Sequence, residues 1–173
     1  MAIELAIDRG LYQELLDHLA PSEDEQVAFL FTAPPERGET LRVVEMYAVP
    51  AQGFADQSPF YLALSDEVRG EVLGRAARLG GCLVEVHSHA LGPAGFSPTD
   101  LDGFEEWVPH VRWRLAGRPY VALVFAGESF DALAWAGDGG GPAPLAGLAV
   151  DGAGTLLPTG ITYRQLSRDA RGG

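Results

Sequence analysis

The sequence lacks several features that would point to particular partners or compartments. It contains no lysine, and its 12 basic residues against 24 acidic ones give a net charge of −12. No cluster of arginines relieves this charge locally, so we expect no nucleic-acid partner. The one cysteine, Cys82, excludes an internal disulfide and fits a reducing compartment. No apolar run approaches the roughly 20 residues that span a bilayer, and residues 1–10 do not resemble a secretion signal, so we expect a cytoplasmic protein without a membrane partner.

The length and composition predict a single folded unit. The chain has 173 residues, of which 47% are hydrophobic, enough for one domain with a core but not for two. We assign residues 1–165 to this domain. Residues 166–173 are polar and end in Arg171-Gly172-Gly173, and we expect them to form a flexible tail.

Hydrophobic spacing and turn residues predict the order of the elements. Helices are expected at residues 11–20, 66–79 and from Ser97 onward, with Ser65 and Ser97 suited to cap the last two. Strands are expected at residues 26–32, 40–50, 60–64, 82–89, 119–127 and 130–137, with a possible last hairpin over 145–158. This order predicts an α/β fold (an α+β sandwich) in which helices flank a mixed β-sheet.

Two histidines and an aspartate form a candidate metal site. His87 and His89 are two apart in an expected strand, so they project from the same face. Asp100 falls in the first turn of the next expected helix and can approach them. Two histidines and one carboxylate leave a fourth tetrahedral position open, the arrangement of a catalytic zinc ion, one per chain. Ser97 is close enough in sequence to offer its hydroxyl to a developing oxyanion.

The same stretch carries a family resemblance. It reads His87-Ser88-His89, seven further residues, and then Ser97-Pro98-Thr99-Asp100. This pattern resembles the signature of the JAMM (MPN+, also called JAB) zinc metalloproteases, and the order of elements over residues 26–135 resembles their compact prokaryotic branch. The resemblance implies a cytidine-deaminase-like fold and a deubiquitinase-like isopeptidase or peptidase. Such an enzyme cleaves after the C-terminal glycine of a ubiquitin-like protein, in deconjugation or precursor processing, and works beside E1-like or E2-like partners.

The resemblance also implies a glutamate from an upstream strand, which carries a proton from the attacking water to the leaving amine. Glu45 matches by position, because it lies on a valine-rich strand that ends at a proline. Glu36 and Glu39 fall in the expected turn and fit less well. Glu85 shares the strand face of His87, and we interpret it as a group behind the ligands or as a structural carboxylate.

Two other functions stay open at this point. One is a zinc-containing module that binds without turnover. The other is a small-molecule metallohydrolase or deaminase, although a single cysteine does not supply the cysteine pair of the zinc deaminases.

Three further segments have an interpretation from the sequence. Trp107 and Trp113 are expected to pack in the core, with a groove for a substrate tail as the alternative. The acidic run at 22–25 is expected to be solvated. The loop over residues 51–60 resembles in position the variable insert that grips the substrate tail.

Overall fold

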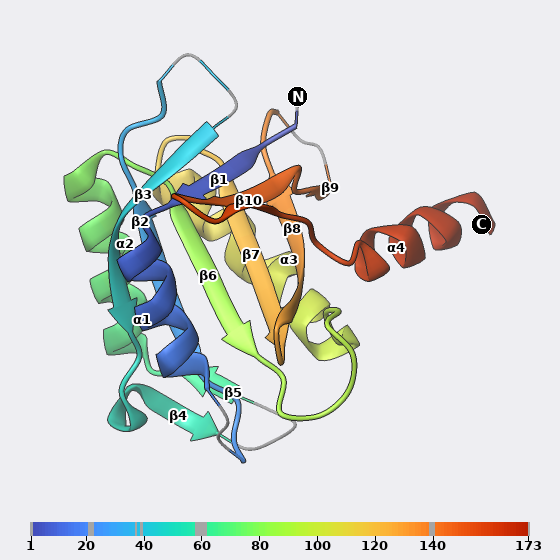
Figure 1. Cartoon of the computed structure of the whole chain (residues 1–173), viewed down its shortest axis with the longest axis horizontal. Helices are drawn as coiled ribbons and strands as arrows, with labels where there is room; N and C mark the ends of the chain where they lie inside the picture. The colour runs from blue at the N-terminus through green and yellow to red at the C-terminus, as the bar shows by residue number, and fades with distance from the viewer. Residues whose placement is uncertain are drawn as a thin grey trace.

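The computed structural model describes residues 2–20, 23–36, 38, 40–57, 62–138 and 141–172 (Figure 1). Its helices are α1 (Arg9–Leu19), α2 (Asp66–Leu79), α3 (Pro98–Arg114) and α4 (Ile161–Gly172), with a 3-10 turn at Ala51–Gly53. Its strands are β1 (Glu4–Ile7), β2 (Val27–Thr32), β3 (Thr40–Ala48), β4 (Phe54–Gln57), β5 (Leu62–Leu64), β6 (Leu83–Ser88), β7 (Tyr120–Ala126), β8 (Ser129–Trp135), β9 (Ala143–Pro144), β10 (Gly147–Val150) and β11 (Gly154–Leu156).

Nine of the strands in the described residues form one curled, mixed sheet, in the order β11-β10-β1-β3-β2-β6-β7-β8-β9. Strand β1 runs parallel to both β3 and β10, and β6 runs parallel to β7, whereas the other neighbours are antiparallel. Strands β4 and β5 form a separate hairpin. The predicted class, a mixed sheet flanked by helices, is therefore confirmed.

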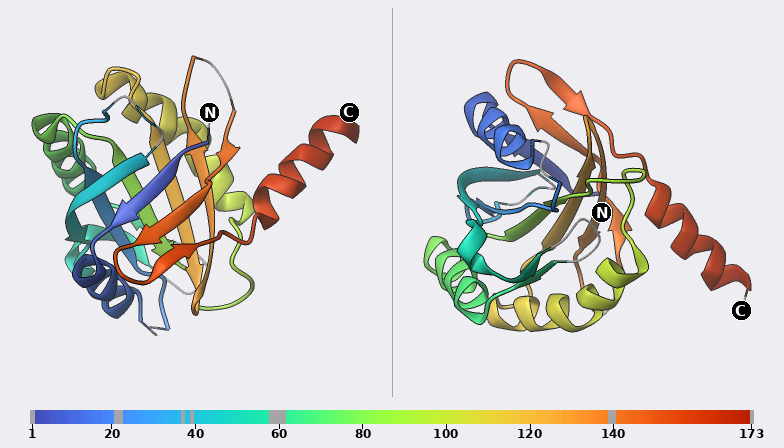
Figure 2. Two further views of the ribbon diagram at one scale, coloured as in Figure 1. Left: turned by 45° about the horizontal axis from the view of Figure 1, so that its top comes forward. Right: turned by 90° about the horizontal axis from the view of Figure 1, so that it is seen from below.

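Helices cover both faces of the sheet (Figure 2). Buried side chains form one apolar core on each face. Helix α1 buries Leu15 and Leu19 on one face, against apolar residues of strands such as β1, β6 and β7. Helices α2 and α3 pack on the other face, where Val72 and Val108 meet the side chains of β2 and β7. Strand β2 contributes to both cores because its side chains alternate between the two faces, and all six of its residues are buried.

The predicted helix caps are confirmed. Ser65 accepts a hydrogen bond from the Val68 N–H at the start of α2, and Gly80 ends that helix in the left-handed conformation, with a φ of 69°. Ser97 caps α3 in a reciprocal arrangement with Asp100.

The structure differs from the sequence predictions in several places, and Phe54–Gln57 of the expected loop form strand β4. Strand β1 lies inside the sheet but was not predicted, because its four residues are too few for a periodic pattern. The expected tail is helical as far as Gly172, as α4, and projects from the body (Figures 1 and 2). Trp113 is 76% exposed and does not pack in the core as predicted.

Glu39 and Gly173 lie outside the described residues, as do residue 22 of the acidic run and residues 58–61 of the expected loop and strand. Across the part of the chain that is described, no helix combines the length and apolar character needed to cross a membrane.

Candidate metal centre

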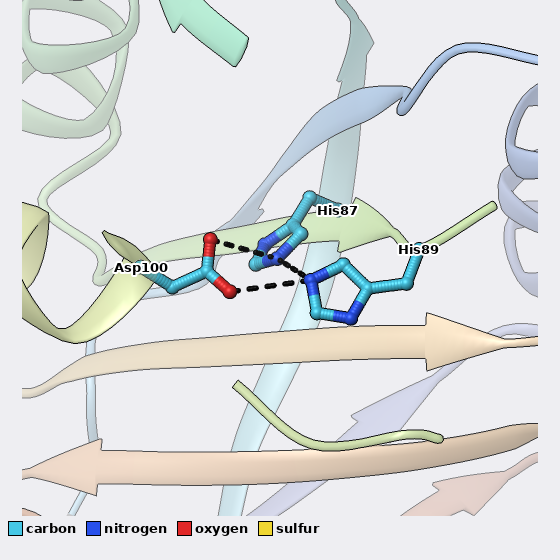
Figure 3. Close-up of side chains that lie close together, drawn as sticks. All are labelled: His87, His89 and Asp100. Atoms are coloured by element: carbon cyan, nitrogen blue, oxygen red, sulfur yellow. Dashed lines mark hydrogen bonds and ion pairs between the residues drawn. The ribbon is translucent and has the colours of Figure 1, made fainter. Parts of the chain in front are cut away.

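His87, His89 and Asp100 converge on one point at the end of β6 (Figure 3). The Nε2 atoms of the two histidines are 3.2 Å apart. The Asp100 carboxylate lies 3.2 Å from His89 Nε2 through Oδ2 and 3.5 Å from His87 Nε2 through Oδ1. Ligand atoms placed about 2.0–2.1 Å from a tetrahedral zinc ion are about 3.3 Å from one another. The three side chains therefore fit a single zinc ion.

Backbone pairing explains why the two histidines lie at this position. His87 is paired with Val27 on β2 and with Val124 on β7, which fixes it in the middle of the sheet. The His89 N–H donates to the Phe125 carbonyl at 2.8 Å, so the strand pairing extends past the last residue of β6. The His87 ring also packs against Phe96, with 5.7 Å between ring centroids.

Ser97 orients Asp100 from the other side. The Asp100 N–H donates to Ser97 Oγ at 3.1 Å, and the Ser97 N–H donates to Asp100 Oδ2 at 2.7 Å, which is a capping box at the start of α3. Burial alone would raise the pKa of Asp100, but hydrogen bonds from both histidines and from this N–H hold the pKa well below its usual range. The carboxylate is thus ionised, as a metal ligand must be.

The structure does not bring Glu45 to this cluster. Glu45 is exposed on β3 and is paired with Phe31 of β2, whereas His87 is paired with Val27 of the same strand. The four residue steps from Val27 to Phe31 separate the two levels by roughly 13 Å along the strand. The prediction of Glu45 as the proton carrier therefore needs correction, because β2 and β3 are antiparallel and Ala48, not Glu45, is the residue at the end of β3 nearest the cluster. Glu36, the other described candidate from the turn, is exposed in the β2–β3 connection.

Glu25, and not Glu45 as predicted, is the glutamate that lies beside the three clustered side chains. Its carboxylate Oε1 lies 3.9 Å from His89 Nε2, and the residue is only 7% exposed, not solvated as predicted. Gln26 joins this segment to the motif, because its N–H donates to Ser88 Oγ and its carbonyl accepts from the Ser88 N–H, both at 2.9 Å. Burial raises the pKa of Glu25, and Asp100 raises it further, while the two histidines act in the opposite direction.

A signal for Glu25 was present in the sequence. It stands two residues before Val27, at the start of a wholly apolar strand, so strand alternation carries it to the face of Val27 and His87. The missing information was the pairing of β2 with β6, which a single sequence does not supply.

The cluster opens into a cavity of about 250 Å³ between β5, α2 and α3. Glu25, His87 and Asp100 line it together with Arg69, Glu85 and others, namely Ala63, Leu64, Thr99, Gly103, Phe104 and Trp107. Glu85 Oε1 lies 4.0 Å from His87 Nδ1, the ring nitrogen that faces away from Asp100. The expected place of Glu85 behind the ligands agrees with this geometry.

Tyr120 holds Glu85 in position. The Tyr120 hydroxyl donates to Glu85 Oε2 at 2.6 Å and accepts from Trp107 Nε1–H at 3.1 Å. Burial raises the pKa of both Glu85 and Tyr120. Glu85, Tyr120 and Trp107 therefore form a continuous polar network inside the core that lies between the sheet and helices α2 and α3.

Tyr120→Phe is expected to destabilise the protein by about 1–3 kcal/mol, because it leaves two mostly buried polar groups without their partner. For a chain of this size each kcal/mol corresponds to about 2–4 °C in Tm. Thermal unfolding followed by circular dichroism measures the change, with Tyr163→Phe on exposed α4 as the matched control. Equal Tm values for the two variants would contradict a stabilising role for the network.

Zinc affinity is expected to decrease as the pH is lowered, and the decrease should begin at a pH above 6.5. Burial alone would lower the pKa of His87, but the hydrogen bond and charge of Asp100, with Glu85 and Glu25 nearby, raise the pKa above its ordinary value of 6.5. Zinc binds the neutral ring, so protons compete with the metal at a higher pH than for an isolated histidine. Competition titrations with a chromophoric chelator between pH 8 and 5 measure this, and an affinity that stays flat down to pH 6 contradicts it.

Comparisons with known proteins identify a family and a shared fold. The family described as "Prokaryotic homologs of the JAB domain" matches residues 8–136. No protein of curated function matches the chain. Among solved structures, the chain is similar to the solution structure of protein DSY2949 from Desulfitobacterium hafniense, with a TM-score of 0.53 and 17% identity. That alignment covers 84% of this chain and 92% of the other. At this identity the likeness shows a shared fold.

Proposed function

Because the chain belongs to the prokaryotic homologs of the JAB domain, we propose that it is a zinc-dependent peptidase or isopeptidase that cleaves after the C-terminal glycine of a ubiquitin-like protein. The observation that carries the proposal is the triangle of His87, His89 and Asp100 with a second, buried carboxylate, that of Glu25, at its edge. A structural zinc site uses four protein ligands, whereas three ligands and a nearby base suit hydrolysis.

Each of these residues has a defined task in the proposed reaction. His87, His89 and Asp100 would hold the metal, which would polarise the scissile carbonyl and lower the pKa of a water molecule. Glu25 accepts a proton from the attacking water and delivers it to the leaving amine, and burial raises its pKa above that of an ordinary glutamate, which favours proton uptake. The Ser97 hydroxyl, whose oxygen accepts the Asp100 N–H, retains its own hydrogen for the oxyanion.

In this proposal the β4–β5 hairpin holds the extended tail of the substrate. Ala63 and Leu64 of β5 line the cavity beside the ligands, and an extended peptide can pair with an exposed strand edge. A tail that ends in glycine would bring little side-chain bulk into this cavity of about 250 Å³.

Incubation of the zinc-loaded protein with ubiquitin-like fusions tests the proposal. Mass spectrometry is expected to show cleavage directly after the C-terminal glycine, and cleavage that requires zinc. A stable complex without cleavage would instead identify a binding module. Turnover of small amides without any fusion cleavage would identify a small-molecule hydrolase.

A further inference from the structure

The chain after β8 extends beyond the family match, which ends at residue 136, yet part of it contacts the metal loop. After β11, residues 158–162 pass beside Ala94–Phe96 and lead into α4. The metal loop, residues 90–96, joins His89 to Ser97, so its shape determines how the two halves of the candidate site meet.

Asp131 fixes residues 158–162 to the sheet. It lies on β8 with no exposed surface, and its two carboxylate oxygens accept the N–H groups of Gly160 at 2.8 Å and Thr162 at 2.9 Å. The adjacent Phe130 carbonyl accepts the Thr159 N–H at 2.8 Å. A buried carboxylate is stable only when it is paired or hydrogen-bonded, so this arrangement is a specific anchor.

Two threonines connect the anchored segment to the metal loop. Thr162, also without exposed surface, accepts the Phe96 N–H through Oγ1 at 2.9 Å. The Thr159 hydroxyl donates to the Ala94 carbonyl at 2.7 Å. Between these two hydrogen bonds the backbone of Gly95 lies close to Ile161: a Cβ at position 95 would be 3.3 Å from the Ile161 side chain. The loop is thus held at successive residues.

The held residues lie directly beside the metal ligands. Phe96 packs its ring on His87, and the next residue, Ser97, is bonded to Asp100 in both directions. We propose that residues 158–162 form a positioning element of the site, in which Asp131 and Thr162 set the metal loop and thereby the placement of Ser97 and Asp100. The kinetic part of this inference rests on the proposed function, whereas the structural part does not.

Thr162→Val tests the inference with little change in volume, because it replaces the accepting hydroxyl by a methyl group. Thr162→Ser keeps the hydroxyl and is the rescue variant, and Thr159→Val removes the second link separately. Gln165→Ala, on exposed α4, is the matched control. Amide hydrogen exchange, zinc affinity and steady-state kinetics are measured on each zinc-loaded full-length protein, with circular dichroism to verify folding.

In Thr162→Val we expect faster exchange at residues 94–97 and roughly tenfold weaker zinc binding. We also expect a loss in kcat of roughly 10–100-fold with KM unchanged, because a small displacement of the catalytic groups slows chemistry more than binding. Thr162→Ser should recover most of each effect. Unchanged exchange and zinc affinity in folded Thr162→Val and Thr159→Val would overturn the inference. If the wild type proves inactive but Thr162→Val still shows faster exchange and weaker zinc binding, only the proposed function is refuted.

Discussion

Glu25→Gln is expected to lower kcat by about 10²–10⁴-fold while the protein keeps its zinc. The amide has nearly the same shape as the carboxylate but cannot accept a proton from the attacking water. Glu25 is buried and lies 3.9 Å from His89 Nε2, at the edge of the ligand triangle rather than within it. Hydrolysis of a ubiquitin-like fusion gives kcat, and elemental analysis of the dialysed protein gives the zinc content.

Glu45→Gln is the matched control, since it makes the same chemical change on a neighbouring strand. Glu45 is exposed and is paired with Phe31, away from the cluster, so we expect kcat within about twofold of wild type. A large loss in Glu45→Gln with normal activity in Glu25→Gln would reverse the assignment. Loss of zinc in Glu25→Gln would instead make Glu25 a ligand.

Asp100→Ala is expected to abolish both zinc binding and hydrolysis. It removes one of three ligands, and the charge stabilisation that a metal supplies to a carbonyl, several kcal/mol, corresponds to a rate loss of about 10³-fold or more. Wild type should also gain about 2.7 kcal/mol of stability at a free zinc concentration 100 times its Kd, and the variant should not. Calorimetric titration and thermal unfolding with and without zinc measure both effects, and a chelator should reproduce the loss of activity in wild type.

Asp102→Ala, an exposed acidic residue on the same helix, controls for the loss of a negative charge near the start of α3. It should bind zinc and hydrolyse substrate like wild type. Retention of zinc and activity in Asp100→Ala would contradict the assignment of this residue as a ligand. Zinc-dependent stabilisation without hydrolysis in wild type would favour the binding module.

Local sequence determined much of the fold and the ligand set. The seryl caps of α2 and α3 were predictable because a cap depends on residues within one turn of the helix. His87 and His89 could be placed on one face because strand alternation is a local property, and Asp100 followed from the cap at Ser97. The apolar run of β2 likewise predicted a buried strand, and all six of its residues are buried.

Only the tertiary structure decided which distant segments meet at these ligands. Glu25 reaches the site because β2 pairs with β6 in the register that opposes Val27 to His87. The antiparallel register of β2 with β3, which opposes Phe31 to Glu45, keeps Glu45 away. The register depends on contacts between residues some 60 positions apart. The same holds for Asp131 and Thr162, whose hydrogen bond joins β8 to the start of α4. Sequence spacing alone carries no information on such long-range pairing, because it is set by packing of the whole sheet.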